Sequence, residues 1–455
     1  MKKYDVIIIG GGPSGIVTGV TVKNYYPEKS VLILTEEEKG LVPCGIPYIF
    51  HRLGSVEKDA MGFKPLLDAG GEVIVDPATD VNLEKKEVYG KSGETYHYDK
   101  LVFATGSLPV EAKFIKGYDL EEVYYIKKSY RYIQKLFDAL KGKSRIVIVG
   151  GGFIGAEVAE QLVANGKKVV LIESEEQCFS KAFSKQLSKI ATDELRKTGV
   201  EVKTSMLVEE ILGKEGKACG VRLRSGEEIP AEAVILSVGY RPNTSLAVKA
   251  GLPLNIMGAI KVDNYERTSV KDVCAVGDCS QTIGFLTGRS DHIMLASTAT
   301  AEARVLGYNL FGIRIKKNFM GTIAVFSTQI NGLTMASAGI NENTGKDANV
   351  RFMVSEFSDV DKHPGTLPGA HPLTVRLTFS PTDGAILGGE VWGGPTAAEI
   401  INIISMAIQK YITVFELISY QIGTHPLLTS APTKPVLVKA AEKAIIMMKK
   451  ANGTA

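Results

Sequence analysis

One cysteine stands in a setting that could make it reactive. Cys44 lies in the segment Leu41–Tyr48 (LVPCGIPY), where Pro47 predicts the first turn of a helix that runs to about Leu53. A thiol at a helix N-terminus faces free N–H groups and the positive end of the helix dipole, which lower its pKa and favour the thiolate. A cysteine in an apolar segment is more often a small core residue. The segment nevertheless makes Cys44 a candidate nucleophile.

The remaining cysteines show no pattern of their own. Together with Cys44 they make an odd total of five, and no two of them form a CxxC pair. They are Cys178, Cys219, Cys274 and Cys279. Neither a disulfide framework nor a zinc site is indicated, so we expect no metal and a reducing, cytoplasmic location.

Two glycine-rich turns each connect a strongly apolar strand to a predicted helix. The first turn, GGGPSG, follows the strand Tyr4–Ile9, and the second, GGGFIG, follows Arg145–Val149. In this pattern the first glycine permits a tight turn, the second lets the backbone approach a pyrophosphate, and the third lets helix and strand pack closely. One such turn is weak evidence, because glycine turns also occur merely to pack a fold, but two in this context predict two dinucleotide sites. The predicted contacts are Gly10, Gly12, Pro13, Ser14 and Gly15 in the first site, and Gly150, Gly152, Phe153, Ile154 and Gly155 in the second.

An acidic residue follows the second strand of each unit. Glu173 closes the strand Lys168–Ile172, where a carboxylate can accept hydrogen bonds from both ribose hydroxyls and would repel a 2′-phosphate. The second site is therefore predicted to take NADH, with NADPH less favoured. In the first unit the candidate is Glu36, which comes just after the corresponding strand.

Three further apolar strands end in small residues. Residues 101–107 and 233–239 (AVILSVG) repeat one pattern, and a third strand ends in AVGDC. The two units therefore look like internal repeats, and Asp278 follows a glycine at the end of the third strand. Without the surrounding motifs, Asp278 would be interpreted as a turn aspartate that caps the helix after it.

The ordered series GGGPSG, ATG, GGGFIG, SVGYRPN and AVGDC resembles the FAD-dependent pyridine nucleotide-disulfide oxidoreductases over essentially the whole chain. The resemblance implies an α/β fold with two Rossmann-like dinucleotide-binding domains and a C-terminal α+β dimerisation domain, and hence a homodimer. It implies an FAD-binding domain built from residues 1–112 and 240–320, an NAD-binding domain at 113–239 and a dimerisation domain at 321–455. It also implies that Asp278 hydrogen-bonds the ribityl chain of FAD. The strand ends of the same motifs are then expected to line the dinucleotide sites through Ala104, Thr105, Gly106, Gly239 and Gly277.

The surroundings of Cys44 resemble one branch of this family. Where two-cysteine members carry their second cysteine, five positions on, this chain has Ile49. The sequence CGIPY is similar to the single-cysteine branch, which holds coenzyme A-disulfide reductases, persulfide and sulfur reductases, NADH oxidases and NADH peroxidases. The resemblance implies that hydride passes from NADH to FAD and that the flavin reduces a Cys44 adduct, which is a mixed disulfide, a persulfide or a sulfenic acid.

Departures from the branch patterns favour a sulfur acceptor over oxygen. Oxidases and peroxidases of the branch usually carry a histidine inside the first glycine turn, where this chain has Pro13-Ser14. Coenzyme A-disulfide reductases usually carry arginines on the first helix, where this chain offers only Lys23, so strict coenzyme A specificity is not indicated. The leading hypothesis is reduction of a disulfide, persulfide or polysulfide. The alternatives are an NADH oxidase that acts through a Cys44 sulfenic acid and a flavin-binding sensor without significant turnover.

Two further residues match family positions. His425-Pro426 resembles the His-Pro of the two-cysteine reductases, where the partner subunit's histidine is the acid-base group, and an imidazole titrates near neutrality. Thr429 and Ser430 stand where that family places an orienting glutamate. Glu157 matches a glutamate near flavin and nicotinamide, but its usual lysine partner is missing.

The composition agrees with a multidomain enzyme. A chain of 455 residues is expected to form two or three domains, and its net charge of +3 disfavours nucleic acid or an anionic membrane as a partner. The most apolar stretch, residues 400–420, contains Gln409, Lys410 and Glu416, so we predict a core helix there and no membrane span. No export signal is visible at the start of the chain. His363 and His371 are predicted to lie in a loop between dimer-domain strands.

Overall fold

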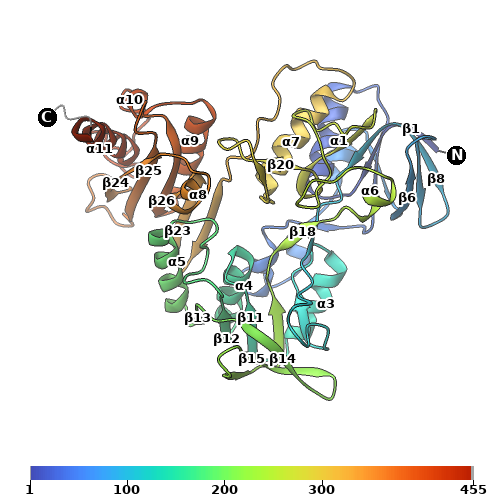
Figure 1. The fold of residues 1–455 in the computed structure, drawn as a ribbon, viewed down its shortest axis with the longest axis horizontal. Helices are drawn as coiled ribbons and strands as arrows, with labels where there is room; N and C mark the ends of the chain where they lie inside the picture. The colour runs from blue at the N-terminus through green and yellow to red at the C-terminus, as the bar shows by residue number, and fades with distance from the viewer. Residues whose placement is uncertain (1, 452–455) are drawn as a thin grey trace.

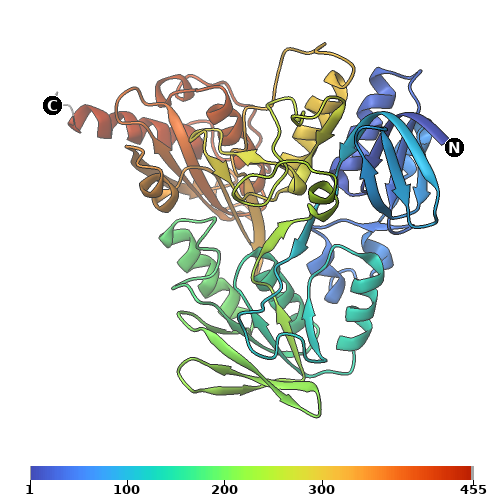
Figure 2. The same ribbon diagram turned by 45° about the vertical axis from the view of Figure 1, so that its right-hand side comes forward.

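Three large sheets organise the computed structural model, which describes residues 2–451 (Figure 1). Two of them are parallel or mostly parallel, and the third is antiparallel. Figures 1 and 2 both show the second sheet below the other two, with the C-terminal sheet on one side and the N-terminal sheet on the other. The predicted α/β class, with two Rossmann-like units and a C-terminal α+β unit, is confirmed.

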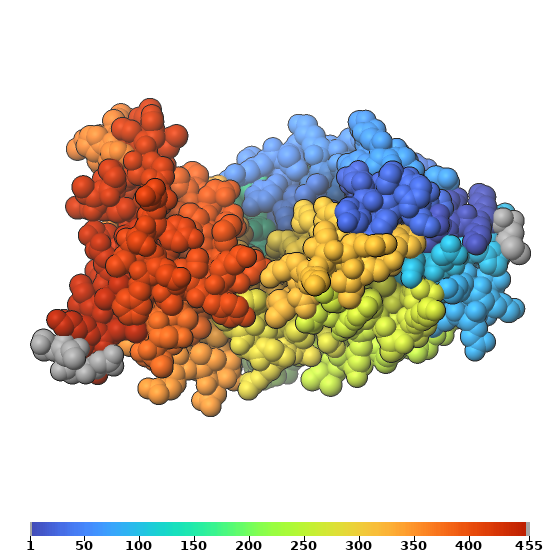
Figure 3. Space-filling view, turned by 90° about the horizontal axis from the view of Figure 1, so that it is seen from above, coloured from blue at the N-terminus to red at the C-terminus, as the bar shows by residue number. Residues whose placement is uncertain are grey.

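The first sheet is built from two distant stretches of chain. Its order is β5 (Glu72–Val75), β2 (Val31–Thr35), β1 (Lys2–Ile9), β8 (Thr95–Phe103), β7 (Glu87–Gly90) and β6 (Ala78–Asn82). β19 (Val273–Ala275) joins in parallel beside the last residues of β8, while β7 pairs with its first residues. The helices α1 (Pro13–Tyr25) and α7 (Ala296–Asn309) pack against each other. In Figure 3 the N-terminal part of the chain (blue) and the part around α7 (yellow) accordingly lie side by side.

The second sheet is wholly parallel. Its order is β10 (Val123–Tyr125), β17 (Ala233–Leu236), β11 (Arg145–Val149), β12 (Lys168–Ile172) and β13 (Glu201–Lys203). The helices of this unit are α3 (Tyr130–Leu140), α4 (Phe153–Ala164) and α5 (Lys185–Lys197). An antiparallel sheet of β14 (Val208–Lys214), β15 (Lys217–Leu223) and β16 (Glu228–Pro230) extends below it in Figure 1.

A two-stranded ribbon joins these two units. β9 (Ser107–Pro109) leads out of the first unit and β18 (Tyr240–Pro242) leads back, and the two pair in antiparallel fashion. The predicted domain boundaries at 112/113 and 239/240 fall at or just beside this ribbon, and the boundary at 320/321 precedes the third sheet. The boundaries themselves stay a prediction.

Two helices, α9 and α11, pack against the third sheet. Its order is β22 (Phe326–Ile330), β23 (Leu333–Gly339), β26 (Ile386–Gly393), β25 (Pro372–Phe379) and β24 (Met353–Val360). α9 (Ala397–Gln409) packs on β23 and β26, and α11 (Val436–Ala451) packs on β24 and β25. The remaining helices here are α8 (Glu342–Asp347) and α10 (Val414–Leu417). His363 and His371 lie in the connection between β24 and β25, as predicted.

The apolar stretch 400–420 is not one helix. α9 ends at Gln409, Tyr411 follows with a positive φ of 55°, and α10 begins after a capping box between Thr413 and Glu416. The prediction of a single core helix was therefore wrong at its C-terminal end, because Glu416 caps a new helix instead of lying on the old one. Among residues 2–451 no helix has both the length and the apolar character needed to cross a bilayer.

The remaining elements of the described chain are short. They are β3 (Gly40–Leu41), η1 (Ile46–Phe50), η2 (Glu57–Asp59), β4 (Ala60–Met61), α2 (Lys64–Asp68), α6 (Ser245–Lys249), η3 (Gly277–Cys279), β20 (Thr282–Ile283) and β21 (Ser290–Asp291). The helix predicted from Pro47 to Leu53 is only the five-residue 3₁₀ helix η1. It ends because His51 leaves helical geometry, with φ −148° and ψ −66°.

The two glycine turns obey the same steric rule. A Cβ on Gly10 would lie 2.2 Å from the Ala104 carbonyl oxygen, and one on Gly150 would lie 2.3 Å from that of Ser237. Both residues also adopt a left-handed φ, of 116° and 107° respectively. Each turn therefore requires glycine where its backbone touches the neighbouring strand end.

The third glycine of each turn predicts a stability effect. In Gly155→Ala the new Cβ would lie 2.0 Å from the Gly150 carbonyl oxygen, so we expect a loss of about 3 kcal/mol in the free energy of unfolding. In the matched variant Gly152→Ala the Cβ meets nothing within 4 Å and φ is −72°, so the loss should stay below about 1 kcal/mol. Denaturant unfolding followed by circular dichroism measures both values. Equal losses in the two variants would contradict the steric explanation.

Candidate functional site

Two helix N-termini offer matching anion cradles. α1 and α4 start from Gly12 and Gly152, which are extended and provide no side-chain cap. A Cβ on either glycine would find open space. Uncapped N–H groups and the helix dipole at such a start favour a phosphate group, and the missing side chain lets it come close. The residues present thus fit the pyrophosphate of one dinucleotide at each turn.

Glu173 lies at the rim of the second turn. Its carboxylate accepts a hydrogen bond from the Gly151 N–H at 2.6 Å and another from the Glu175 N–H at 2.8 Å. These bonds hold the side chain at the C-terminal end of β12, next to the glycine turn. The position is the one from which a carboxylate can reach a ribose.

Glu36 does not occupy the equivalent place in the first unit. Ile9 pairs with Leu34 across β1 and β2, just as Val149 pairs with Ile172 across β11 and β12. The residue equivalent to Glu173 is therefore Thr35, and Glu36 is one position further on and exposed. A Cβ on Gly11 would meet the Thr35 hydroxyl at 3.0 Å. Sequence reasoning missed Thr35 because it searched for a carboxylate.

The first turn of α1 meets the turn that carries Asp278. A Cβ on Gly277 would lie 2.7 Å from the Ser14 hydroxyl, and Gly277 has a φ of 76°. The Asp278 carboxylate accepts hydrogen bonds from Ser107 Oγ at 2.7 Å and from Lys128 Nζ at 2.6 Å. The alternative that Asp278 merely caps the next α-helix is wrong, because α7 begins only at Ala296.

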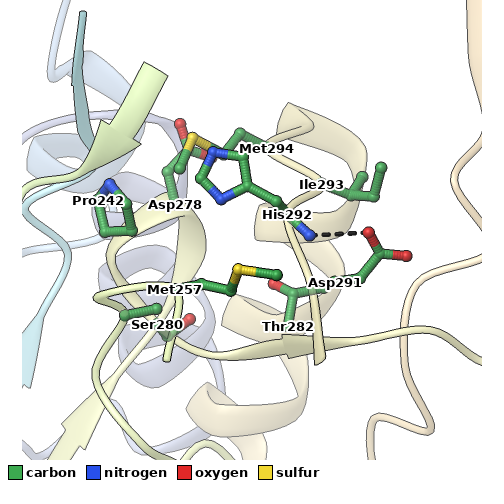
Figure 4. A pocket seen from close by; sticks show the side chains of 10 residues that line it. Pro242, Met257, Asp278, Ser280, Thr282, Asp291, His292, Ile293 and Met294 are labelled. Atoms are coloured by element: carbon green, nitrogen blue, oxygen red, sulfur yellow. Dashed lines mark hydrogen bonds between the residues drawn. The ribbon is translucent and has the colours of Figure 1, made fainter. Parts of the chain in front are cut away.

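A recess opens beside Asp278 (Figure 4). Its lining includes Pro242, Met257, Asp278, His292 and Met294. The Nε2 atom of His292 lies 2.8 Å from the Tyr240 carbonyl oxygen. A carbonyl oxygen only accepts, so Nε2 carries the proton and Nδ1 is left as an acceptor. His292 was missed by sequence reasoning because a lone histidine outside any motif carries no signal.

The other predicted nucleotide contacts lie at strand ends. Ala104, Thr105 and Gly106 form the turn after β8, where Thr105 Oγ1 donates to the Asn243 carbonyl at 2.6 Å. Gly239, with a φ of 109°, ends the corresponding turn after β17. In the second cradle Ile154 is partly buried and the Phe153 ring stacks on Phe326 at a centroid distance of 5.3 Å, so the Phe153 side chain packs on the third sheet.

The thiol of Cys44 is accessible but is not activated by a helix. The residue is exposed and precedes η1, which is too short to present a helix dipole. Neighbouring protein atoms displace water from the thiol and, with the charge of Glu157, raise the pKa of Cys44 above its ordinary value. Lys128 acts in the opposite direction. The predicted lowering of the Cys44 pKa was therefore wrong, because no helix N-terminus offsets the desolvation and the carboxylates.

Glu157 and Tyr48 lie close to Cys44. α4, which carries Glu157, packs against η1, which carries Tyr48. Burial raises the pKa of Glu157 to about 7, although a hydrogen bond of 2.7 Å from Thr328 works against the shift. Burial, followed by the charge of Glu157, raises the pKa of Tyr48 to about 12. Three segments far apart in sequence thus converge here, and neither Tyr48 nor Thr328 carried a sequence signal for this role.

His425 lies apart from this cluster. It is exposed, in the loop between α10 and α11, and its hydrogen bonds stay within that loop. Its Nδ1 accepts from the Leu427 N–H at 3.2 Å, so the proton of the neutral ring is on Nε2. The Thr429 carbonyl, in the same turn, lies 2.9 Å from His363 Nδ1. One backbone N–H thus holds the ring of His425 within its own loop.

The residues described contain no grouping of three or more His, Cys, Asp and Glu side chains that could hold a metal ion. The site therefore consists of two anion cradles, the recess at Asp278 and an accessible thiol beside a buried carboxyl group.

Comparison with known families identifies this arrangement. A family model described as pyridine nucleotide-disulphide oxidoreductase matches residues 4–303, and a model described as the dimerisation domain of the same family matches residues 324–436.

Individual relatives fall into two groups by name. An NADH oxidase of Methanocaldococcus jannaschii is 28% identical over 423 residues, which cover 90% of this chain and 92% of that protein. A protein of Pyrococcus horikoshii named NAD(P)H coenzyme A polysulfide/persulfide reductase is 29% identical over 430 residues, which cover 91% and 92%. The structure of an NAD-dependent persulfide reductase from A. fulgidus superimposes with a TM-score of 0.88 at 27% identity, covering 98% of this chain and 84% of that one.

The raised pKa of Glu157 predicts a pH-dependent stability. Because the pKa of Glu157 is about 7 in the folded protein and 4.5 for a free carboxyl group, the folded protein retains a proton that the unfolded chain releases, and the free energy of unfolding falls as pH rises between these values. Glu157→Gln should therefore raise the free energy of unfolding above about pH 7, by on the order of 3 kcal/mol. The difference should vanish below about pH 4.5. Denaturant midpoints across this pH range measure it.

Glu84→Gln, at an exposed position, is the matched control and should leave the profile unchanged. A Glu157→Gln profile parallel to that of the unsubstituted protein would disprove the shift.

Proposed function

Since the chain belongs to the pyridine nucleotide-disulphide oxidoreductase family, we propose that it uses NADH and FAD to reduce a disulfide, persulfide or polysulfide through Cys44. The observation that carries the proposal is one accessible thiol beside two anion cradles and a buried carboxyl group that titrates near neutrality. The persulfide and polysulfide reductases among the relatives support it.

We assign FAD to the first cradle and NADH to the second. Ser14 and Gly277 are in contact, so the α1 turn and the Asp278 carboxylate can serve one extended ligand, with Asp278 bonding its ribityl chain. Glu173 beside the second turn suits a ribose with free hydroxyls. The predicted residues Ala104, Thr105, Gly106 and Gly239 would complete the two sites from the neighbouring strand ends.

When bound, FAD and NADH supply a two-electron reduction. The Cys44 thiolate attacks one sulfur of the substrate disulfide, so that a Cys44 mixed disulfide forms and the other sulfur leaves as a thiolate. Two electrons then cleave the mixed disulfide, which regenerates the Cys44 thiolate and releases the second product thiolate. Overall one NADH and one proton convert a disulfide into two thiols.

Two groups can move protons during this cycle. Glu157 has a pKa of about 7 and lies near Cys44, so it can hold a proton beside the thiol and release it near neutral pH. His425 can give a proton to a departing thiolate when its ring is in the imidazolium form. Because the bonds of His425 stay within its own loop, we propose that it serves the Cys44 site of a second subunit.

We further propose a homodimer formed through the third sheet unit. The match to a dimerisation domain supports it. Large apolar side chains are exposed on α9, on α10 and along the chain up to His425: Ile403, Met406, Phe415, Ile418, Tyr420 and Ile422. Leu427 and Leu428, just after His425, are 54% and 65% exposed in the single chain, so burial in an interface would also bring His425 to a partner. The cytoplasmic location stays a prediction.

Oxygen is the second candidate acceptor. NADH oxidases among the relatives favour it, whereas Pro13 and Ser14 occupy the turn where such oxidases usually carry a histidine. A sensor without turnover is disfavoured, because the family is one of enzymes.

Replacing the thiol tests the central step. In Cys44→Ser we expect the anaerobic rate of NADH-dependent polysulfide and disulfide reduction to fall by at least about 10³-fold, because no mixed disulfide can form. Reduction of the bound flavin by NADH in a single turnover should persist, since the two cradles are intact. Cys219→Ser, at an exposed thiol in β15, is the control and should retain full activity.

Full sulfur reduction by Cys44→Ser would disprove the proposal. Rapid oxygen uptake by the unsubstituted protein, with negligible anaerobic turnover on every sulfur acceptor, would establish the oxidase instead. His425→Gln should slow sulfur turnover without slowing single-turnover flavin reduction.

The carboxylate of Glu173 predicts the coenzyme preference. Glu173→Ala removes the acceptor for the ribose hydroxyls and the charge that repels a 2′-phosphate, so the ratio of kcat/KM for NADH to that for NADPH should fall by about 10–100-fold. Glu201→Ala, at an exposed position in β13, should leave the ratio unchanged. An unaltered ratio in Glu173→Ala would remove this residue from coenzyme selection.

A further inference from the structure

We propose that His363 is a positioning residue for the acid-base step: it holds the turn that carries His425. The inference rests on the proposed function in one respect, namely that His425 gives a proton to a departing thiolate in a second subunit. It concerns a histidine in the loop between β24 and β25, which belongs to neither cradle and to no glycine turn.

Residues 425–430, called the His425 turn below, form a turn that is closed by its own hydrogen bonds. The Thr429 N–H donates to the His425 carbonyl at 3.0 Å, and the His425 N–H donates to Thr429 Oγ1 at 3.0 Å. His425, Leu427 and Leu428 are all exposed. These bonds give the turn its shape, but they do not fix its place on the rest of the molecule.

His363 fixes that place with two hydrogen bonds. Its backbone N–H donates to the Pro426 carbonyl at 3.0 Å, and its Nδ1 lies 2.9 Å from the Thr429 carbonyl oxygen. A carbonyl oxygen only accepts, so Nδ1 of His363 carries a proton and donates it to this bond. Pro426 directly follows His425, and Thr429 lies three residues further on. The two bonds therefore hold the turn near its start and near its end.

Few other bonds join the His425 turn to the molecule. The Ser430 hydroxyl donates to the Val360 carbonyl at 2.8 Å, close to His363 in the chain. Among residues 2–451, the hydrogen bonds that leave the turn all end on residues 360–363. From that side they involve two backbone groups and one side chain, the ring of His363. A substitution of His363 therefore removes the one side-chain bond that this loop gives to the turn.

The loop that carries His363 is itself anchored. Asp361 is 3% exposed, and its N–H donates to the His371 carbonyl at 3.0 Å. Its Oδ1 accepts from the His371 N–H at 2.8 Å. A Cβ on Gly394 would lie 2.5 Å from Asp361 Oδ2, so the carboxylate packs directly on the backbone that follows β26. The loop is thus closed at its base and fixed to the third sheet.

The position of the His425 ring follows the position of its turn. Within its loop the ring is bonded by one backbone N–H, that of Leu427. A general acid must come within hydrogen-bond reach of the leaving atom, and a misplacement of about 1 Å can slow a reaction by about 10²-fold. His363 therefore sets the place from which His425 reaches a second subunit.

The alternative is that His363 itself supplies the proton. Its Nδ1–H is already engaged with the Thr429 carbonyl, and its side chain is partly buried. Asparagine distinguishes the two roles, because its amide nitrogen takes the place of Nδ1 and can bond Thr429 but cannot protonate a thiolate.

The test compares variants of His363 in the FAD-loaded protein. In His363→Leu we expect kcat for anaerobic polysulfide reduction to fall by about 10–100-fold, while single-turnover reduction of the flavin by NADH stays unchanged. His363→Asn should keep the unsubstituted kcat. His363→Gln places its amide nitrogen where Nε2 lies, so it should behave like His363→Leu, and it serves if the leucine variant fails to fold.

His371→Leu is the matched control in the same loop. The ring of His371 lies 3.3 Å from Asp361 Oδ2, makes no bond to the His425 turn, and belongs to a side chain that is 51% exposed. The two backbone bonds between these residues survive the substitution. This variant should keep full sulfur turnover.

A double-mutant cycle shows whether His363 acts through His425. In a His425→Gln background, His363→Leu should cause no further loss of kcat, because the group that it positions is already absent. A further loss of the same size in that background, or a loss of activity in His363→Asn, would overturn the proposal.

Hydrogen exchange separates this inference from the proposed function. Exchange in a peptide that covers residues 421–435 should become about tenfold faster in His363→Leu and stay unchanged in His363→Asn. Unaltered exchange in His363→Leu would show that His363 does not hold the turn. If Cys44→Ser retained sulfur reduction, the proposed function would fail, while the exchange rates would still decide whether His363 positions the His425 turn.

Discussion

The close contact between a glycine turn and a neighbouring strand end is the constraint on which the site depends. Gly10 packs against the Ala104 carbonyl and Gly150 against that of Ser237, at distances that no side chain tolerates. Each contact sets where a helix begins relative to its sheet. Because α1 and α4 must start at these points, their uncapped N–H groups face open space at the C-terminal edge of a parallel sheet. A bound phosphate needs that combination of dipole and room.

The rest of the site follows from what these turns bring together. Gly277 fits against Ser14 only without a side chain, and this contact places Asp278 beside the first cradle. The ribbon of β9 and β18 connects the second unit to the first. In this arrangement α4 lies against η1, and Glu157 comes near Cys44. Thr328 of the third sheet completes the cluster by bonding Glu157. The candidate site thus lies where the three units meet.

Local patterns predicted the parts, and distant contacts decided their chemistry. The strand Lys168–Ile172 and both glycine turns were predicted correctly, because apolar runs and steric limits act over a few residues. The environment of Cys44 was not, since its desolvation and its carboxylate neighbours come from segments remote in sequence. Thr35 in place of an acid, and Lys128 at Asp278, likewise depend on register and on a junction between units. No periodicity in the chain encodes such a junction.

The raised pKa of Cys44 is compatible with the proposed reaction once the charge of each state is considered. A thiolate with a higher pKa is less abundant at neutral pH, but each thiolate is the stronger nucleophile. Its conversion to a mixed disulfide removes negative charge from a place crowded by Glu157, Asp278 and Asp59, so the same carboxylates that disfavour the thiolate favour the adduct. The reductive step runs the other way, because it returns charge to the sulfur. The proton that Glu157 can hold near neutral pH offsets this return of charge.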